Sequence, residues 1–89
     1  MERLIQFLHT KLKYEINAQA LVVENIGAMI EAYSPYNNHR LYVTPYYKHV
    51  SVDHRHGTTY LEHAQFEYDD PELISQIIKY FQFLADKYF

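Results

Sequence analysis

The end of the chain carries its strongest structural signal, an apolar helical arc that other elements must cover. Apolar side chains recur at helical spacing from Leu73 to Tyr88, which is typical of an amphipathic helix. Asp70 is expected to cap the first turn, Pro71 suits the first helical position, and Glu72 complements the positive end of the helix dipole. Further aromatic residues make the arc wider than one sheet face requires: Tyr80, Phe83 and Phe89. Together with Tyr88 they are the residues expected at a protein interface. We therefore expect a C-terminal helix with apolar surface to spare.

The first part of the chain predicts a second helix followed by an ambiguous stretch. Leucine and isoleucine at helical spacing predict an amphipathic helix over residues 2–14. Residues 18–33 fit either a helix or a strand, and Gly27 would weaken a helix by roughly 1 kcal/mol relative to alanine. We favour a strand from about 27 to 34, which stops at Ser34-Pro35 before a turn at "YNNH".

The middle of the chain predicts β-structure. Tyrosine, valine and threonine crowd residues 40–53, and these residues suit a half-buried pleated surface. Pro45 cannot donate to a ladder, so we expect an edge position or a bulge there. The segment "HRHG" then turns the chain into a partner strand, Thr58–Tyr68. The predicted fold is α+β: an N-terminal helix, a three-stranded antiparallel meander and a C-terminal helix, with the helices packed on the sheet.

Composition bounds the class of protein. The 89 residues are 48% hydrophobic, enough for the core of one domain over residues 1–89. The chain has no cysteine, which excludes disulfides and thiolate zinc sites and favours a cytoplasmic location. No apolar run approaches the roughly 18 residues of a membrane span, so we expect a soluble protein without a membrane partner. With two glycines there is no phosphate-cradling loop, and we expect neither an enzyme nor a cofactor.

Histidines gather around "SVDHRHGTTY". Imidazole nitrogens bind zinc, nickel or copper, and a hairpin can bring ligands from two strands to within about 5 Å. The spacing matches no established metal motif. We expect exposed polar residues around a turn; a divalent metal site, or a softer proton-sensing cluster, is the alternative for His49, His54, His56 and His63.

Tyrosines and cations form a second candidate site on the first strands. Such residues can stack bases and meet phosphates, or fill a protein interface. The net charge is −3 and the RNA-recognition signature is absent, so a protein partner is favoured over nucleic acid. The residues concerned are Arg40, Tyr42, Tyr46, Tyr47 and Lys48.

The functional hypothesis is a small non-catalytic accessory module that binds or inhibits a partner protein. The spare apolar surface of the C-terminal helix favours a homodimer formed through it. The layout is common among small accessory proteins, including inhibitors made by phages and other mobile elements, but that is an analogy of size and architecture. The alternatives are a nucleic-acid-associated protein and a metal-binding hairpin.

Overall fold

Seven elements follow one another in the computed structural model, which describes residues 2–16, 21–36 and 38–89. The five strands form one antiparallel sheet in the order in which they occur along the chain. Because each strand pairs with its neighbour in sequence, every connection is a hairpin. The elements are α1 (Glu2–Glu15), β1 (Val22–Asn25), β2 (Ile30–Tyr33), β3 (His39–Pro45), β4 (His49–His56), β5 (Thr59–Glu67) and α2 (Leu73–Tyr88).

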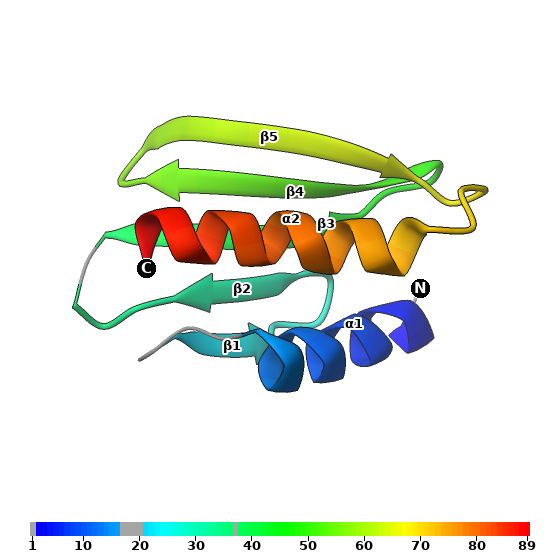
Figure 1. The fold of residues 1–89 in the computed structure, drawn as a ribbon, viewed down its shortest axis with the longest axis horizontal. Coiled ribbons are helices and arrows are strands. Elements are labelled where there is room, and N and C mark those ends of the chain that lie inside the picture. Colours follow the sequence, from blue (N-terminus) through cyan, green and yellow to red (C-terminus); the bar gives the residue numbers. More distant parts are fainter. Residues whose placement is uncertain (1, 17–20, 37) are drawn as a thin grey trace.

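Both helices cover the same face of the sheet. Figure 1 shows α2 running across the middle strands and α1 lying beside β1. Alternate residues of β2, β3 and β4 point toward the helices and form the core with the apolar stripes of α1 and α2. Of the elements that the structure describes, none covers the opposite face. The fully buried members of the core include Ile5, Leu8, Leu12, Ile30, Leu41, Val43, Val50, Val52, Ile77, Phe81 and Leu84.

The α+β class is confirmed, but the expected three strands are wrong and the sheet has five. Pro45 ends β3 opposite Val50 instead of interrupting a longer strand, and the chain turns through residues 46–48. The backbone N–H of Tyr46 donates to the carbonyl of His49 across this turn, at 2.7 Å. A strand end tolerates proline because the missing N–H is not needed there, so no bulge is required at this point.

The ambiguous stretch forms a hairpin. Residues 22–25 are strand β1, which we did not expect, and the strand predicted over 27–34 begins only at Ile30. Gly27 takes a φ of 96°, and its N–H donates to Oδ1 of Asn25 at 2.9 Å. This left-handed conformation turns the chain and excludes a helix. Residues 18–20 of the stretch, and Asn37 of the predicted asparagine turn, lie outside the described residues.

The β4–β5 hairpin continues further than "HRHG" indicates. His56 pairs with Thr59, so the loop has only two residues, and Gly57 at its first position has a φ of 63°. Such tight hairpin turns need positive φ. The register shifts between His54 and Arg55, which leaves Leu61 as the bulged residue of β5. The bulge places Tyr60 on the opposite face from Ala64 and Phe66, although the even spacing of these three residues along the sequence predicts one shared face.

The helices lie close to their predicted positions. α1 extends over residues 2–15, one residue beyond the predicted range. α2 begins at Leu73, so Pro71 and Glu72 precede it and do not form its first turn. The predicted role of Asp70 survives in part, because its Oδ1 accepts the N–H of Glu72 at 2.8 Å. Neither described helix is long and apolar enough to cross a membrane.

Candidate functional site

The face of the sheet without helices, called here the open face, presents rows of polar and aromatic side chains. Alternation along each strand sends the residues between the core positions to this side, and the register aligns them across the strands. The rows are Tyr33, Arg40, Arg55 and Tyr60; then Glu31, Tyr42, Asp53 and His63; then Thr44, Ser51 and Gln65.

Arg40 is held within the sheet by its neighbours on β2. Its Nη1 lies 2.8 Å from Oε1 of Glu31, and its Cζ lies 4.9 Å from the centre of the Tyr33 ring. The Tyr33 hydroxyl donates to Oε1 of Glu24 at 3.2 Å, and this bond raises the pKa of Tyr33. The positive charge of Arg40 is therefore compensated by a carboxylate on the same face.

Arg55 is placed differently. Its Cζ lies 4.3 Å from the centre of the Tyr60 ring and 4.9 Å from that of Tyr42, a cation–π geometry with both rings. Its Nη2 donates to the Tyr60 hydroxyl. Within the described ranges no carboxylate lies at ion-pair distance from it, and its buried Nε has no hydrogen-bond partner there. Arg55 is thus a half-buried cation enclosed by aromatic rings.

Asp53 organises the middle of the open face. It is 9% exposed and accepts a hydrogen bond from the Ser51 hydroxyl at 3.1 Å and a second contact from Nδ1 of His63. Nε2 of His63 lies 3.3 Å from the Gln65 amide nitrogen. A nucleophilic triad needs a serine bonded to histidine, whereas here both Ser51 and His63 bond to the carboxylate. Asp53 is therefore buried together with Ser51 and His63, and Ser51 is not bonded to a histidine that could activate it.

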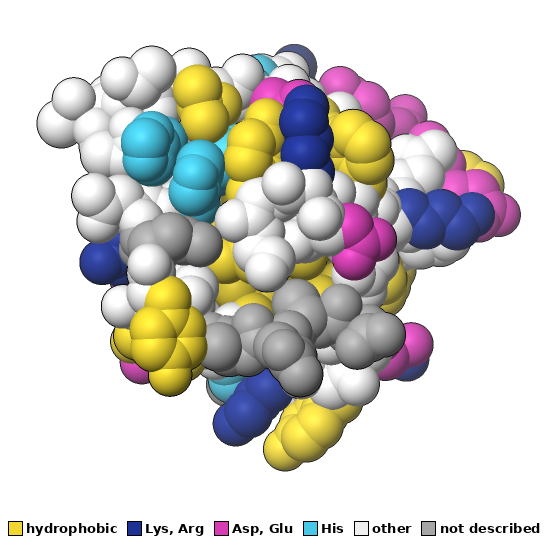
Figure 2. Space-filling view, turned by 60° about the vertical axis from the view of Figure 1, so that its left-hand side comes forward, with side chains coloured by type: hydrophobic (Ala, Val, Ile, Leu, Met, Phe, Trp, Pro, Cys, Tyr) yellow, Lys and Arg dark blue, Asp and Glu magenta, His cyan; other side chains and the backbone are white. Residues whose placement is uncertain are grey.

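A histidine cluster lies on the other face, at the end of α2. Nδ1 of His39 and Nε2 of His54 are 2.8 Å apart, and His39 stacks on His56 with ring centres 4.3 Å apart. The ring of Tyr88 packs 3.8 Å from that of His54. His54 is fully buried, and burial lowers its pKa to about 4. Figure 2 shows histidine side chains side by side on the surface at this end of the molecule.

The expectation of an exposed hairpin tip is therefore wrong for His54, and the structure does not bring the four predicted metal ligands together. His49 lies at the far end of β4, opposite Glu67, and His63 lies on the open face. The companion of His54 and His56 is His39, which the sequence analysis missed. The described part of the chain holds no group of three or more side chains suited to a metal ion.

The predicted interface residues separate into several places. Arg40 and Tyr42 lie on the open face, while Tyr46, Tyr47 and Lys48 form the exposed β3–β4 turn. Tyr80 packs against Phe66, and Tyr88 and Phe89 lie against the histidine cluster. Phe83 is 52% exposed. The residues that sequence reasoning missed, Arg55 and Tyr60, are identified only by the register of β3, β4 and β5.

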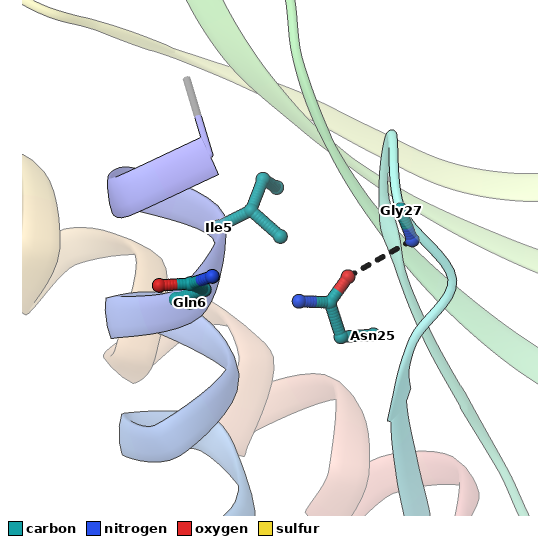
Figure 3. Close-up of a pocket in the computed structure, with 4 residues that line it drawn as sticks. All are labelled: Ile5, Gln6, Asn25 and Gly27. Atoms are coloured by element: carbon teal, nitrogen blue, oxygen red, sulfur yellow. Dashed lines mark hydrogen bonds between the residues drawn. The ribbon is translucent and has the colours of Figure 1, made fainter.

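Two of the hollows formed by the described residues lie on the helix side. One, of about 200 Å³, lies between α1 and the β1–β2 turn and is lined by Ile5, Gln6, Asn25 and Gly27 (Figure 3). Its lining carries no titratable or nucleophilic side chain. The other, of about 500 Å³, is a shallow groove between the helices, with Ile74 and Ile78 on its floor and Lys11 and Lys79 among its lining.

No family model, curated protein or solved structure matches the chain. Function must therefore be inferred from this geometry, in which the open face gathers the residue types that dominate protein interfaces, tyrosine and arginine.

Proposed function

We propose that the protein is a non-catalytic, homodimeric binding module that recognises a partner protein with its open face. The observation that carries the proposal is the row formed by Tyr33, Arg40, Arg55 and Tyr60. Tyrosine and arginine are enriched among the residues that contribute most to protein binding. Their side chains here are already ordered by contacts with one another, so little conformational entropy is lost when a partner binds.

The charge of the open face favours a protein over nucleic acid. Nucleic-acid surfaces need uncompensated cations along the path of the phosphates. Here Glu24, Glu31 and Asp53 are interleaved with the two arginines, and Arg40 is bonded to Glu31. A phosphate backbone laid across these rows would meet carboxylates as often as cations, whereas a mixed protein surface can match both.

Self-association is proposed along β5 and the flank of α2. β5 is a nine-residue edge strand whose outer backbone groups can pair with another strand, and it contains no proline or lysine to prevent this. The other edge, β1, has four residues and packs beside α1. The exposed Phe83 lies next to Tyr80, whose ring contacts Phe66 of β5. Two copies related by a two-fold axis could pair their β5 strands and bury both Phe83 rings.

The test of partner recognition compares two double variants in a pull-down from the native host. Tyr33→Ser with Tyr60→Ser alters the open face. Tyr36→Ser with Tyr47→Ser removes two tyrosines that are 84% and 90% exposed elsewhere, and is the matched control. A partner retained by wild type and control but lost by the open-face variant supports the proposal.

Equal retention by both double variants would contradict it. Filter binding of single-stranded and duplex nucleic acid at low salt tests the other class of partner, since tight binding that the open-face variant abolishes would favour nucleic acid. Light scattering tests self-association, and a monomer at the highest attainable concentration would remove that part of the proposal.

A further inference from the structure

We infer that Arg55 is the receptor for a carboxylate side chain, aspartate or glutamate, of the protein partner, an inference that rests on the proposed function. The partner must then supply a carboxylate, and Arg55 must bind it.

The surroundings of Arg55 leave it short of hydrogen-bond acceptors. A guanidinium has five N–H donors, and the described residues satisfy one, through the Tyr60 hydroxyl. Its Nε is enclosed, and the described residues give it no hydrogen-bond partner. The ring centres of Tyr42 and Tyr60 lie 4.9 and 4.3 Å from Cζ, and Nε is buried, so a ligand must approach the terminal edge formed by Nη1 and Nη2. A carboxylate matches such an edge with two parallel hydrogen bonds.

The neighbouring charges show that this shortage is particular to Arg55. Glu31 bonds to Arg40, and Asp53 accepts contacts from Ser51 and His63. The register places Arg40 directly opposite Arg55, and like charges in such a cross-strand pair repel each other. Glu31 relieves this for Arg40, while Arg55 has no equivalent carboxylate within the described parts of the chain. An acidic group from outside would complete the row.

The same surroundings favour a single carboxylate over a chain of phosphates. Asp53 lies two residues from Arg55 on the same face of β4, and Glu31 faces Tyr42 across the adjacent strands. A polyanion bound at Arg55 would extend its next charges toward these acids. One carboxylate flanked by neutral or basic residues avoids that repulsion, and the tyrosine rings provide apolar contact for its neighbours.

The test selects binders from a displayed library of random twelve-residue peptides on the full-length protein. We expect wild type to enrich peptides with aspartate or glutamate at one fixed position. Fluorescence anisotropy of the best peptide should then show at least about a tenfold rise in Kd for Arg55→Met and for Arg55→Lys, which keeps the charge but loses the planar fork. Lys79→Met, which removes a cation from α2 on the other side of the sheet, should leave Kd unchanged.

A change in the peptide tests the same contact on the wild-type protein, so it does not require an Arg55 variant that folds. Replacing the selected acid by glutamine should weaken binding to wild type by at least about tenfold, and Arg55→Met should add little to that loss. Enriched peptides without a fixed acid would overturn the inference about Arg55. If the double variant Tyr33→Ser with Tyr60→Ser still abolished the binding of such peptides, the open face would remain the binding surface and only the role of Arg55 would be lost. A lack of enriched peptides would also overturn the inference. So would an oligothymidylate that binds in an Arg55-dependent way with a lower Kd than any selected peptide.

Discussion

Replacing the buried imidazole of His54 should remove a specific part of the acid sensitivity of the fold. Burial, with repulsion from His39, lowers the pKa of His54 to about 4, against about 6.5 in the unfolded chain. Glu62 raises the pKa, and His56 and Lys87 lower it further. Between these pH values the unfolded state binds a proton that the folded state excludes, so stability present above pH 6.5 is lost as the pH falls toward 4.

The magnitude follows from the two pKa values. Relative to pH 7, His54 alone should lower the free energy of unfolding by about 2 kcal/mol at pH 5 and about 3 kcal/mol at pH 4. His54→Gln retains an amide nitrogen near the position of Nε2 but cannot take up the proton. Between pH 7 and pH 5 the free energy of unfolding should therefore fall by about 2 kcal/mol less in the variant than in wild type, whatever the stability of the variant at neutral pH.

Urea unfolding followed by circular dichroism at pH 7, 6 and 5, at constant ionic strength, measures this difference. His49→Gln is the matched control, because it removes a histidine at the other end of β4, away from the cluster, and leaves the buried His54 in place. Equal pH dependence in wild type and His54→Gln would refute the reasoning. So would an NMR titration in which the His54 ring of the folded protein takes up its proton near pH 6.5.

Three further changes test the turns, the core and the proposed dimer. Gly57→Ala should lower the free energy of unfolding, measured with urea, by about 1 kcal/mol, because residue 57 has a φ of 63° and alanine is strained in that conformation. Ile77→Val, in the fully buried core, should cost about 1 kcal/mol, whereas Ile26→Val, at a side chain that is 51% exposed, should change stability by less than about 0.5 kcal/mol. Phe83→Ser should change the free energy of unfolding of the monomer by less than about 0.5 kcal/mol. It should weaken self-association by at least about tenfold in sedimentation equilibrium, and unchanged self-association would exclude Phe83 from the proposed dimer contact.

The helices could be predicted from sequence because their apolar residues repeat over several turns, and α1 and α2 lie within a few residues of their expected bounds. The number of strands could not. Pro45 has the same local signature whether it interrupts a strand or ends one, since both uses depend only on the missing N–H. Only the pairing of Pro45 with Val50 distinguishes them, and pairing is a property of two segments together.

The same limit applies to the candidate sites. In sequence His54 stands between two charged residues in an apparently polar turn, which favours exposure. Because the loop has two residues, β4 continues to His56, and alternation turns His54 toward α2 while Asp53 and Arg55 face the other way. His39 joins the cluster only once the preceding turn is placed at residues 46–48, which sets it opposite His56.

Register also explains why the histidine cluster and the open face both depend on the placement of β4. A slip of β4 by one residue would move Val50 and Val52 out of the core and carry Arg55 toward the helices, away from the rings of Tyr42 and Tyr60. The apolar residues of β4 therefore specify both sites as they specify the core. Changes to Val50 or Val52 should disturb the surroundings of His54 and of Arg55 together, whereas a change to either site alone should leave the other intact.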